Sequence, residues 1–340
     1  MTNDKCQMNE GKIFRIIDAN LNRATEGMRV VEEICRFILE DEKLTLQVKK
    51  IRGSLGKAMR ACEGQGRRGG LKARKAMEDV GRETYIKQEG ERAGIDGIFR
   101  ANMKRAEEAV RCLEEFSKLL NPEYGRKFKA IRFKLYELET RISLKVEKVE
   151  KLAFNIYVVT DPKLGHLKMI RQALKNGIKL IQLRDKFAPK PEYTRLAKQA
   201  VRLAHRAGAS LILNDHYDLV KETGADGVHL GQSDLRKISL KKLRGKLGED
   251  KLIGVSAGTF SEAKRAQKLG ADYLGVGPIF ATPNKPTVKP VGLKVLARIV
   301  SEASIPVVAI GGINRTNLNK IRSTGCQRVA VISGAEELGG

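Results

Sequence analysis

Two aspartates follow apolar runs at a spacing that would let them share one site. Asp215 comes directly after "LILN", residues 211–214, and Asp234 comes shortly after "GVHLG", residues 227–231. Two carboxylates at the ends of neighbouring strands can hold one Mg²⁺, which prefers oxygen ligands and takes further ligands from water and substrate phosphates. Taken singly, each aspartate has a structural alternative as a helix N-cap.

Basic and small residues follow the other apolar runs. Gln182 and Arg184 lie on one side of the run "KLIQLR", and Lys186 lies just beyond it. The two cations, Arg184 and Lys186, could clamp a diphosphate. Gly311-Gly312 and the Ile332-Ser333 end could bind a phosphate through backbone N–H groups. The pattern describes two phosphorylated ligands, one of them bound with magnesium.

The elements that would position these residues alternate between short strands and amphipathic helices. From about residue 154 there are eight Val/Ile/Leu-rich runs: "FNIYVVT", "KLIQLR", "SLILN", "GVHLG", "KLIGVS", "DYLGVG", "IPVVAIGG" and "RVAVIS". Eight buried parallel strands predict a (β/α)₈ barrel, whose functional residues gather at the carboxyl ends of the strands. A doubly wound sheet is the alternative, but no G-x-G-x-x-G follows the first strand. Only "GAEELGG" follows the eighth run, so closure at that seam is expected to be incomplete or covered by a partner.

Residues 1–150 instead show helical periodicity and an internal duplication. The segment "ANLNRATEGMRVVEEICRFI", 19–38, aligns without a gap on "ANMKRAEEAVRCLEEFSKLL", 101–120. One interpretation is a bundle of duplicated helices with Arg29–Glu33 and Arg111–Glu115 as surface pairs. The other is a shared site built from two polar stripes: Asn20, Arg23 and Glu26, with Asn102, Arg105 and Glu108. The predicted domains are therefore an all-α domain over 1–150 and a barrel over 151–340.

The net charge of +25 raises the question of nucleic acid. The excess lies mainly after residue 150, where 32 Lys and Arg face 15 Asp and Glu, and it is dispersed along helical segments. There is no Trp, no zinc-finger spacing and no RNA-binding aromatic signature, so anionic small molecules are favoured over nucleic acid. No signal peptide or membrane span is predicted, which indicates a cytoplasmic protein without a membrane partner.

Residues 154–334 resemble thiamine-phosphate synthase, a (β/α)₈ enzyme family. The resemblance is carried by seven motifs in family order: "IQLRDK", "ILNDHYDLV", "GVHLGQSD", "IGVSAGT", "YLGVGPIFAT", "AIGGI" and "VIS". It implies a transferase of thiamine biosynthesis that joins 4-amino-2-methyl-5-hydroxymethylpyrimidine diphosphate to a thiazole phosphate and releases pyrophosphate. It also implies a dissociative mechanism, in which the departing pyrophosphate is bound with Mg²⁺ and no protein nucleophile is needed.

The same resemblance implies a role for each residue of these motifs. Asp215 and Asp234 would bind Mg²⁺. The pyrimidine diphosphate would be bound by Gln182, Leu183, Arg184, Asp185, Lys186, Asn214, Ser256 and Lys285. The thiazole phosphate would be bound by Thr282, Asn284, Gly312, Ile332 and Ser333. Among these, Arg184, Lys186, Lys285 and Ser256 would act in catalysis by stabilising charge and aligning the rings. His216 and His229 are expected to have loop and packing roles.

The first 150 residues resemble the helical domain fused to this synthase in some bacteria, through "ARKAMEDVG" and the duplicated "AN..RA.E..R..EE". This implies an ATP-dependent kinase for hydroxymethylpyrimidine phosphate, with an accessory structural module as the alternative. For the whole chain, two other readings stay open: a barrel similar to the thiazole tautomerases, and a basic RNA-binding or interaction protein. The oligomeric state, a homo-oligomer included, is left open.

Overall fold

The structure is a computed structural model that describes residues 2–63, 94–282 and 287–332. The chain divides into two compact units, Met1–Glu150 and Lys151–Gly340. Three residues singled out from the sequence lie outside the described residues: Asn284, Lys285 and Ser333. The motif "ARKAMEDVG", residues 73–81, lies there as well.

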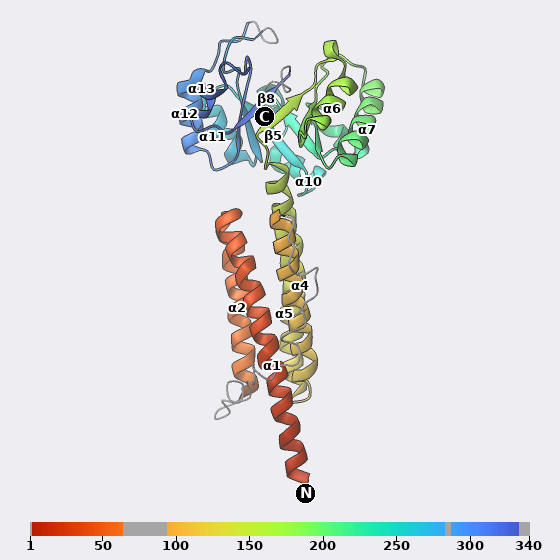
Figure 1. The fold of residues 1–340 in the computed structure, drawn as a ribbon, viewed down its shortest axis with the longest axis vertical. Helices are drawn as coiled ribbons and strands as arrows, with labels where there is room; N and C mark the ends of the chain where they lie inside the picture. Colours follow the sequence, from red (N-terminus) through yellow and green to blue (C-terminus); the bar gives the residue numbers. More distant parts are fainter. Residues whose placement is uncertain (1, 64–93, 283–286, 333–340) are drawn as a thin grey trace. The chain divides into compact units, whose positions relative to one another are not determined.

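The first unit is helical, as predicted (Figure 1). Its elements are α1 (Thr2–Glu33), the π-helix η1 (Ile34–Ile38), α2 (Glu42–Glu63), α4 (Gly94–Ser117) and α5 (Pro122–Lys151). Buried apolar residues recur every three or four positions along α4, which fits a helix with one face in a core. The duplicated helices α1 and α4 pack tightly, because a Cβ added at Gly27 would lie 2.7 Å from the carbonyl oxygen of Asn102.

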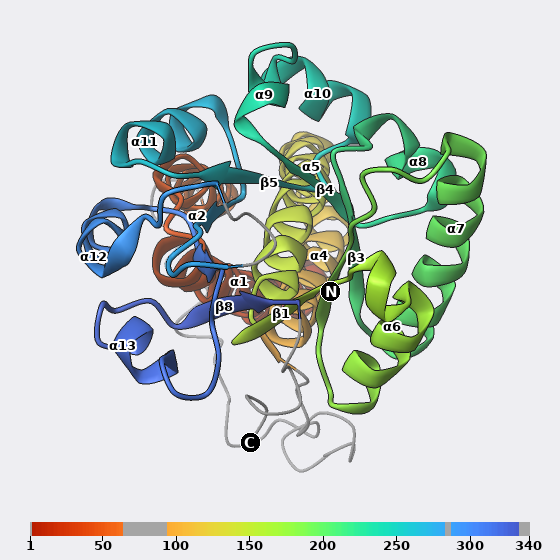
Figure 2. The same cartoon turned by 90° about the horizontal axis from the view of Figure 1, so that it is seen from above.

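The second unit is a closed barrel of eight parallel strands in sequence order (Figure 2). The strands are β1 (Ile156–Val159), β2 (Leu180–Leu183), β3 (Ser210–Asn214), β4 (Gly227–Leu230), β5 (Leu252–Ala257), β6 (Tyr273–Val276), β7 (Val307–Ile310) and β8 (Arg328–Val331). The predicted (β/α)₈ fold is confirmed and the doubly wound alternative is wrong. Of the two alternatives for the seam, incomplete closure is wrong, because β1 pairs with β8 through Ile156 and Val329, Tyr157 and Ala330, and Val158 and Val331.

Helices lie outside the ring of strands, as the view from above shows (Figure 2). They are α6 (His166–Lys175), α7 (Lys190–Arg206), α8 (Val220–Thr223), α9 (Gln232–Leu235), α10 (Leu240–Leu247), α11 (Phe260–Leu269), α12 (Gly292–Glu302) and α13 (Leu318–Arg322), with the 3₁₀ turns η4 (Pro162–Leu164) and η5 (Tyr217–Leu219). Within the described part of the chain, no helix is long and apolar enough to cross a membrane.

Strand side chains alternate between two cores. One core lies between strands and helices and includes Ile181, Leu183, Leu211 and Leu213. The other fills the barrel interior with Tyr157, Val159, Leu180, Ile212, Leu252, Tyr273, Val308 and Ala330. Because side chains alternate along a strand, the residues that continue the interior row emerge at the carboxyl ends. This alternation directs Gln182 inward and Leu183 outward.

Candidate active site

A cavity of about 110 Å³ lies at the barrel interior and its carboxyl-end loops. Six of the residues predicted to bind substrate line it: Gln182, Arg184, Asn214, Ser256, Thr282 and Ile332. They come from β2, β3 and β5 and from the segments after β2, β6 and β8. Residues that are far apart in the sequence are thus brought to one place by the ends of the strands.

The loop after β2 is braced from below the cavity by a buried polar chain. The Thr160 hydroxyl accepts from the Arg184 backbone N–H at 3.1 Å and contacts His166 Nδ1 at 2.8 Å. His166 Nε2 lies 3.1 Å from Asp185, whose other oxygen accepts from the backbone N–H of Phe187 at 3.0 Å. Burial raises the pKa of Asp185, but these hydrogen bonds outweigh it and the pKa is lowered overall. The described contacts of Asp185 therefore hold the loop that carries Arg184.

Two neighbouring strands deliver the predicted metal-binding carboxylates. Asp215 follows β3 with φ of 62°, a left-handed conformation that is uncommon for a residue with a side chain. Its carboxylate accepts from the Asn214 amide at 2.6 Å and also interacts with Asp234. Burial, and then the charge of Asp234, raise the pKa of Asp215, while Lys186 acts in the opposite direction. The charges of Asp234 and Lys186 therefore both act on Asp215, which directly follows the cavity-lining Asn214.

The alternative role as a helix cap applies to Asp234 and not to Asp215. No side-chain hydrogen bond caps η5, the turn after Asp215, and its N-cap residue is His216. Asp234 does have a capping role, because its Oδ2 accepts from the Gly231 N–H at 2.9 Å at the start of α9. Its capping bond fixes the direction in which the Asp234 carboxylate is presented.

A hydrogen-bond chain along the cavity wall connects the buried Gln182 to the partly buried Ser256. The Gln182 amide donates to the Tyr157 hydroxyl, which lies 3.2 Å from the Tyr273 hydroxyl. The Tyr273 hydroxyl lies 3.1 Å from His229 Nδ1, and His229 Nε2 lies 2.9 Å from Ser256 Oγ. The chain thus joins five strands and ends in two predicted substrate-binding residues.

The Gln182 end of this chain has a fixed direction, because the amide N–H donates to the Tyr157 hydroxyl. Each hydroxyl and imidazole nitrogen further along can either donate or accept. Burial raises the pKa of both tyrosines well above the ordinary value, so both hydroxyls keep their protons.

Small residues make room for this chain. A Cβ added at Gly254 would lie 2.1 Å from the Tyr273 ring, and one added at Gly275 would lie 2.8 Å from the His229 ring. In the segment after β7, Gly312 has φ of 68°, and a Cβ added there would meet the Ala281 carbonyl oxygen at 2.6 Å. Both the interior network and the close approach of two loops therefore depend on glycine.

Some residues lie apart from this arrangement. Leu183 is fully buried in the core between strands and helices, and its carbonyl accepts from the Tyr193 hydroxyl at 2.9 Å. Sequence reasoning did not single out Tyr157, Tyr273, Thr160 or His166. It expected only packing for His229, which in fact contacts Ser256. The one available signal was that tyrosine and histidine stood at inward-facing positions of strands otherwise made of aliphatic residues.

The polar stripes of the helical unit do not converge in the described contacts. Asn20 and Asn102 each donate to a carbonyl of their own helix, at Ile16 and Ile98, both at 2.9 Å. The predicted pairs Arg29–Glu33 and Arg111–Glu115 are confirmed, at 2.6 and 2.8 Å.

Comparison with known proteins accounts for both units. The thiamine monophosphate synthase family model matches residues 156–335, and the ThiD2 family model matches residues 15–141. Thiamine-phosphate synthase from Synechocystis sp. (strain ATCC 27184 / PCC 6803 / Kazusa) is 39% identical over 326 residues, covering 94% of this chain and 90% of the relative. The chain belongs to the thiamine-phosphate synthase family.

A second thiamine-phosphate synthase agrees with this assignment. The one from Nostoc punctiforme is 39% identical and covers 94% of this chain and 88% of its own length. A solved thiamine phosphate pyrophosphorylase from Pyrococcus furiosus is 37% identical, with a TM-score of 0.48, and covers 53% of this chain and 85% of its own. The long matches to thiamine-phosphate synthases confirm the resemblance and the predicted enzyme class, and they span the helical unit as well as the barrel.

Proposed function

We propose that the barrel joins pyrimidine diphosphate and thiazole phosphate at the cavity described above, with Mg²⁺ held by Asp215 and Asp234. The observation that supports this most is that Asp215 follows Asn214, which lines the cavity, and lies near enough to Asp234 and Lys186 for both charges to shift its pKa. The raised pKa of Asp215 reflects burial and the charge of Asp234, and a divalent cation would relieve the repulsion between the carboxylates.

The donor set fits magnesium rather than a fully protein-coordinated metal. Among the residues the structure describes, no group of three or more His, Cys, Asp or Glu side chains is placed to hold a metal ion. A two-carboxylate site suits Mg²⁺, which commonly retains waters and binds substrate phosphate. When bound, the ion would supply positive charge to the departing pyrophosphate.

The protein side chains would then bind and align the two substrates. Arg184 and Lys186 carry the positive charge that a diphosphate requires, and the loop after β2 holds Arg184 in place. Gln182 and Asn214 line the cavity with amide groups suited to the amino group and ring nitrogens of a pyrimidine. Lys285 is assigned to the diphosphate by the sequence resemblance alone.

The thiazole phosphate is assigned to the opposite side of the cavity. Thr282 and Ile332 line it, and Gly311 and Gly312 follow β7 with left-handed backbones of φ 100° and 68°. This is the part of a barrel where backbone N–H groups commonly bind phosphate. Asn284 and Ser333 complete the assignment from the sequence resemblance.

Mg²⁺ dependence of thiamine phosphate formation tests the metal assignment. Asp234→Asn should raise the Mg²⁺ concentration needed for half-maximal rate by about tenfold or more, because one charged ligand is lost. Glu222→Gln is the control, since Glu222 pairs with Lys198 at 2.8 Å on α7 and α8. An unchanged Mg²⁺ requirement in Asp234→Asn would contradict the assignment.

For the helical unit, we propose ATP-dependent phosphorylation of the pyrimidine monophosphate, which would produce the substrate of the barrel. The ThiD2 match over residues 15–141 supports this second activity. ADP formation by the full chain, with pyrimidine monophosphate and no thiazole phosphate, measures it independently of thiamine phosphate. Absence of substrate-dependent ADP would leave the unit a structural module.

A further inference from the structure

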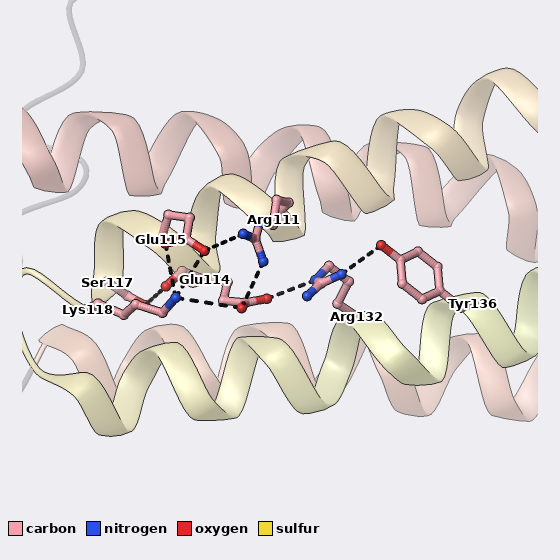
Figure 3. Close-up of polar contacts among 7 residues, drawn as sticks. All are labelled: Arg111, Glu114, Glu115, Ser117, Lys118, Arg132 and Tyr136. Atoms are coloured by element: carbon pink, nitrogen blue, oxygen red, sulfur yellow. Dashed lines mark hydrogen bonds and ion pairs between the residues drawn. The ribbon is translucent and has the colours of Figure 1, made fainter.

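The duplication in the helical unit extends to a buried ion pair in each repeat. Glu114 on α4 has only 3% of its side chain exposed and is held by Arg111 at 3.1 Å and by Arg132 of α5 at 2.8 Å (Figure 3). Glu32 on α1 is equally buried and is held by Arg29 and by Arg52 of α2. The two repeats therefore share one carboxylate, placed between its own helix and the following helix.

The sequence around the second arginine repeats as well. Residues 48–55, "VKKIRGSL", correspond to residues 128–135, "FKAIRFKL". In the second repeat Phe133 and Tyr136 follow Arg132, and its guanidinium lies 5.3 and 5.5 Å from their ring centroids. In the first repeat the same positions are Gly53 and Gly56. The space filled by aromatic rings in one repeat is thus left without side chains in the other.

An open pocket of about 380 Å³ lies at this place in the first repeat. It is lined by Thr25, Lys49, Arg52, Gly53, Gly56 and Arg60. A volume of this order is typical of small-molecule sites.

The two glycines have no packing reason visible in the helix. A Cβ at Gly53 would meet nothing within 4 Å, and at Gly56 the nearest atom would be Arg60 Nη1 at 3.6 Å. Both lie inside α2, where a glycine costs about 1 kcal/mol of stability relative to alanine. The consequence of having glycine at both positions is that the pocket stays open.

The charges of the pocket favour an anion. Lys49, Arg52 and Arg60 line it. Among the described residues, their ion pairs are those of Arg52 and, at 4.0 Å, Lys49 with the buried Glu32. The Arg52 Nε atom is buried and has no hydrogen-bond partner among the described residues. A spare guanidinium donor beside two further cations suits a phosphate group, which has several strong acceptor oxygens.

At the position of Thr25, the second repeat has the acidic residue Glu107 in place of an uncharged hydroxyl. We propose that the pocket between α1 and α2 binds the phosphate group of a phosphorylated small molecule, and that the matching place in the second repeat is closed to it. This deepens the proposed function of the helical unit, since a phosphate monoester is the class of substrate that the kinase would take.

The test compares two double variants of the full chain. Gly53→Phe/Gly56→Tyr fills the pocket with the side chains of the second repeat, whereas Gly53→Ala/Gly56→Ala gains helix stability and leaves the pocket open. The probe is radiolabelled inorganic phosphate in equilibrium dialysis. Any phosphate bound by the barrel contributes equally to both variants, so it does not affect the comparison. The filled variant should lose one bound phosphate per chain, and the alanine variant should keep it. Equal binding by the two variants would overturn the proposal.

A second pair of variants keeps the test decisive if the filled variant does not fold. Arg60→Ala removes a lining cation, and Lys57→Ala removes an exposed cation of α2 that does not line the pocket. Phosphate affinity at the site should fall by about fivefold or more in the first and by less than about twofold in the second. Equal losses in both would also overturn the proposal.

The proposal of a phosphate pocket and the proposal of kinase activity are contradicted by different results. Phosphate binding that is lost in the filled variant, together with no ADP formation by the wild-type chain, would contradict only the kinase. ADP formation that continues unchanged in a folded filled variant with undiminished phosphate binding would contradict only the pocket.

Discussion

Replacing Asp215 by asparagine should raise stability and lower activity at once. The residue has a left-handed backbone with φ of 62°, which asparagine adopts as readily as aspartate. The asparagine oxygen can still accept from Asn214, whose amide lies 2.6 Å from the carboxylate. Asp215→Asn therefore removes the charge and little else, whereas alanine would add about 1 kcal/mol of backbone strain.

The magnitudes follow from the environment of the carboxylate. Burial and Asp234 raise the pKa of Asp215 above its unfolded value, so its ionised form destabilises the folded state once the pH exceeds that unfolded value. Because the side chain is partly exposed and screened, removing the charge should stabilise the apo protein by about 0.5 to 1 kcal/mol near pH 7. The gain should vanish below the unfolded pKa. Loss of a charge that would hold Mg²⁺ should lower kcat/KM by about 100-fold or more.

Two assays separate these effects. Urea unfolding without divalent ions reports the stability, and thiamine phosphate formation with saturating Mg²⁺ reports the activity. Mg²⁺ should raise the unfolding midpoint of the wild-type chain and should do so less for Asp215→Asn. Asp218→Asn is the matched control, because Asp218 lies in the same loop and pairs with Lys190 at 2.5 Å at the surface. Activity within about threefold of wild type, or a clear loss of stability, would refute the reasoning for Asp215.

Three further changes test other parts of the structure. Tyr273→Phe should cost about 1 to 3 kcal/mol in chemical unfolding, because the partly buried His229 Nδ1 loses a partner 3.1 Å away; an unchanged stability would show that the network is not needed for folding. Gly254→Ala should cost about 1 to 3 kcal/mol by the same measurement, since the new Cβ would lie 2.1 Å from the Tyr273 ring, and a neutral effect would mean that the ring moves freely. Burial and the Glu139 carboxylate raise the pKa of Glu107 to about 7, so the stability tied to its protonated form is lost as the pH rises through that value. After discounting for its exposure, Glu107→Gln should stabilise the chain by about 1 kcal/mol at pH 8 and by nearly nothing at pH 4, and a gain equal at both pH values would contradict this.

Local patterns were sufficient to predict the barrel strands. Strands buried on both faces read as continuous aliphatic runs, and their count gave the eight-stranded fold. Complete closure at the seam was in doubt because the pairing of β8 with β1 joins the two ends of the unit, and no local pattern reports such a long-range contact. The π-helix η1 was missed for a related reason, since a single extra residue in a helical turn leaves apolar periodicity almost unchanged.

The sequence predicted the candidate site residues that lie at the ends of strands. It did not predict those that lie inside the barrel. The rule that barrel sites gather at carboxyl ends identified Gln182, Asn214 and Ser256, which line the cavity together. It could not find Tyr157 and Tyr273, because a buried tyrosine inside a strand looks like core until its hydroxyl partners are known.

In the helical unit, the duplication was visible but its chemistry was not. Glu32 and Glu114 were matched by the alignment, yet their burial depends on how the helices pack. The exposed Arg23 and Glu26 were given more attention, and the described contacts do not bring them to a site. Spacing on one helix thus identified equivalent residues without saying which of them face the neighbouring helix.

The formation of thiamine phosphate by the purified full chain tests the central claim most directly. The chain is mixed with the pyrimidine diphosphate, the thiazole phosphate and Mg²⁺, and both thiamine phosphate and pyrophosphate are measured over time. The account predicts that the two products appear in equal amounts, that EDTA stops their formation, and that added Mg²⁺ restores it. No thiamine phosphate, or an amount undiminished by EDTA, would contradict it.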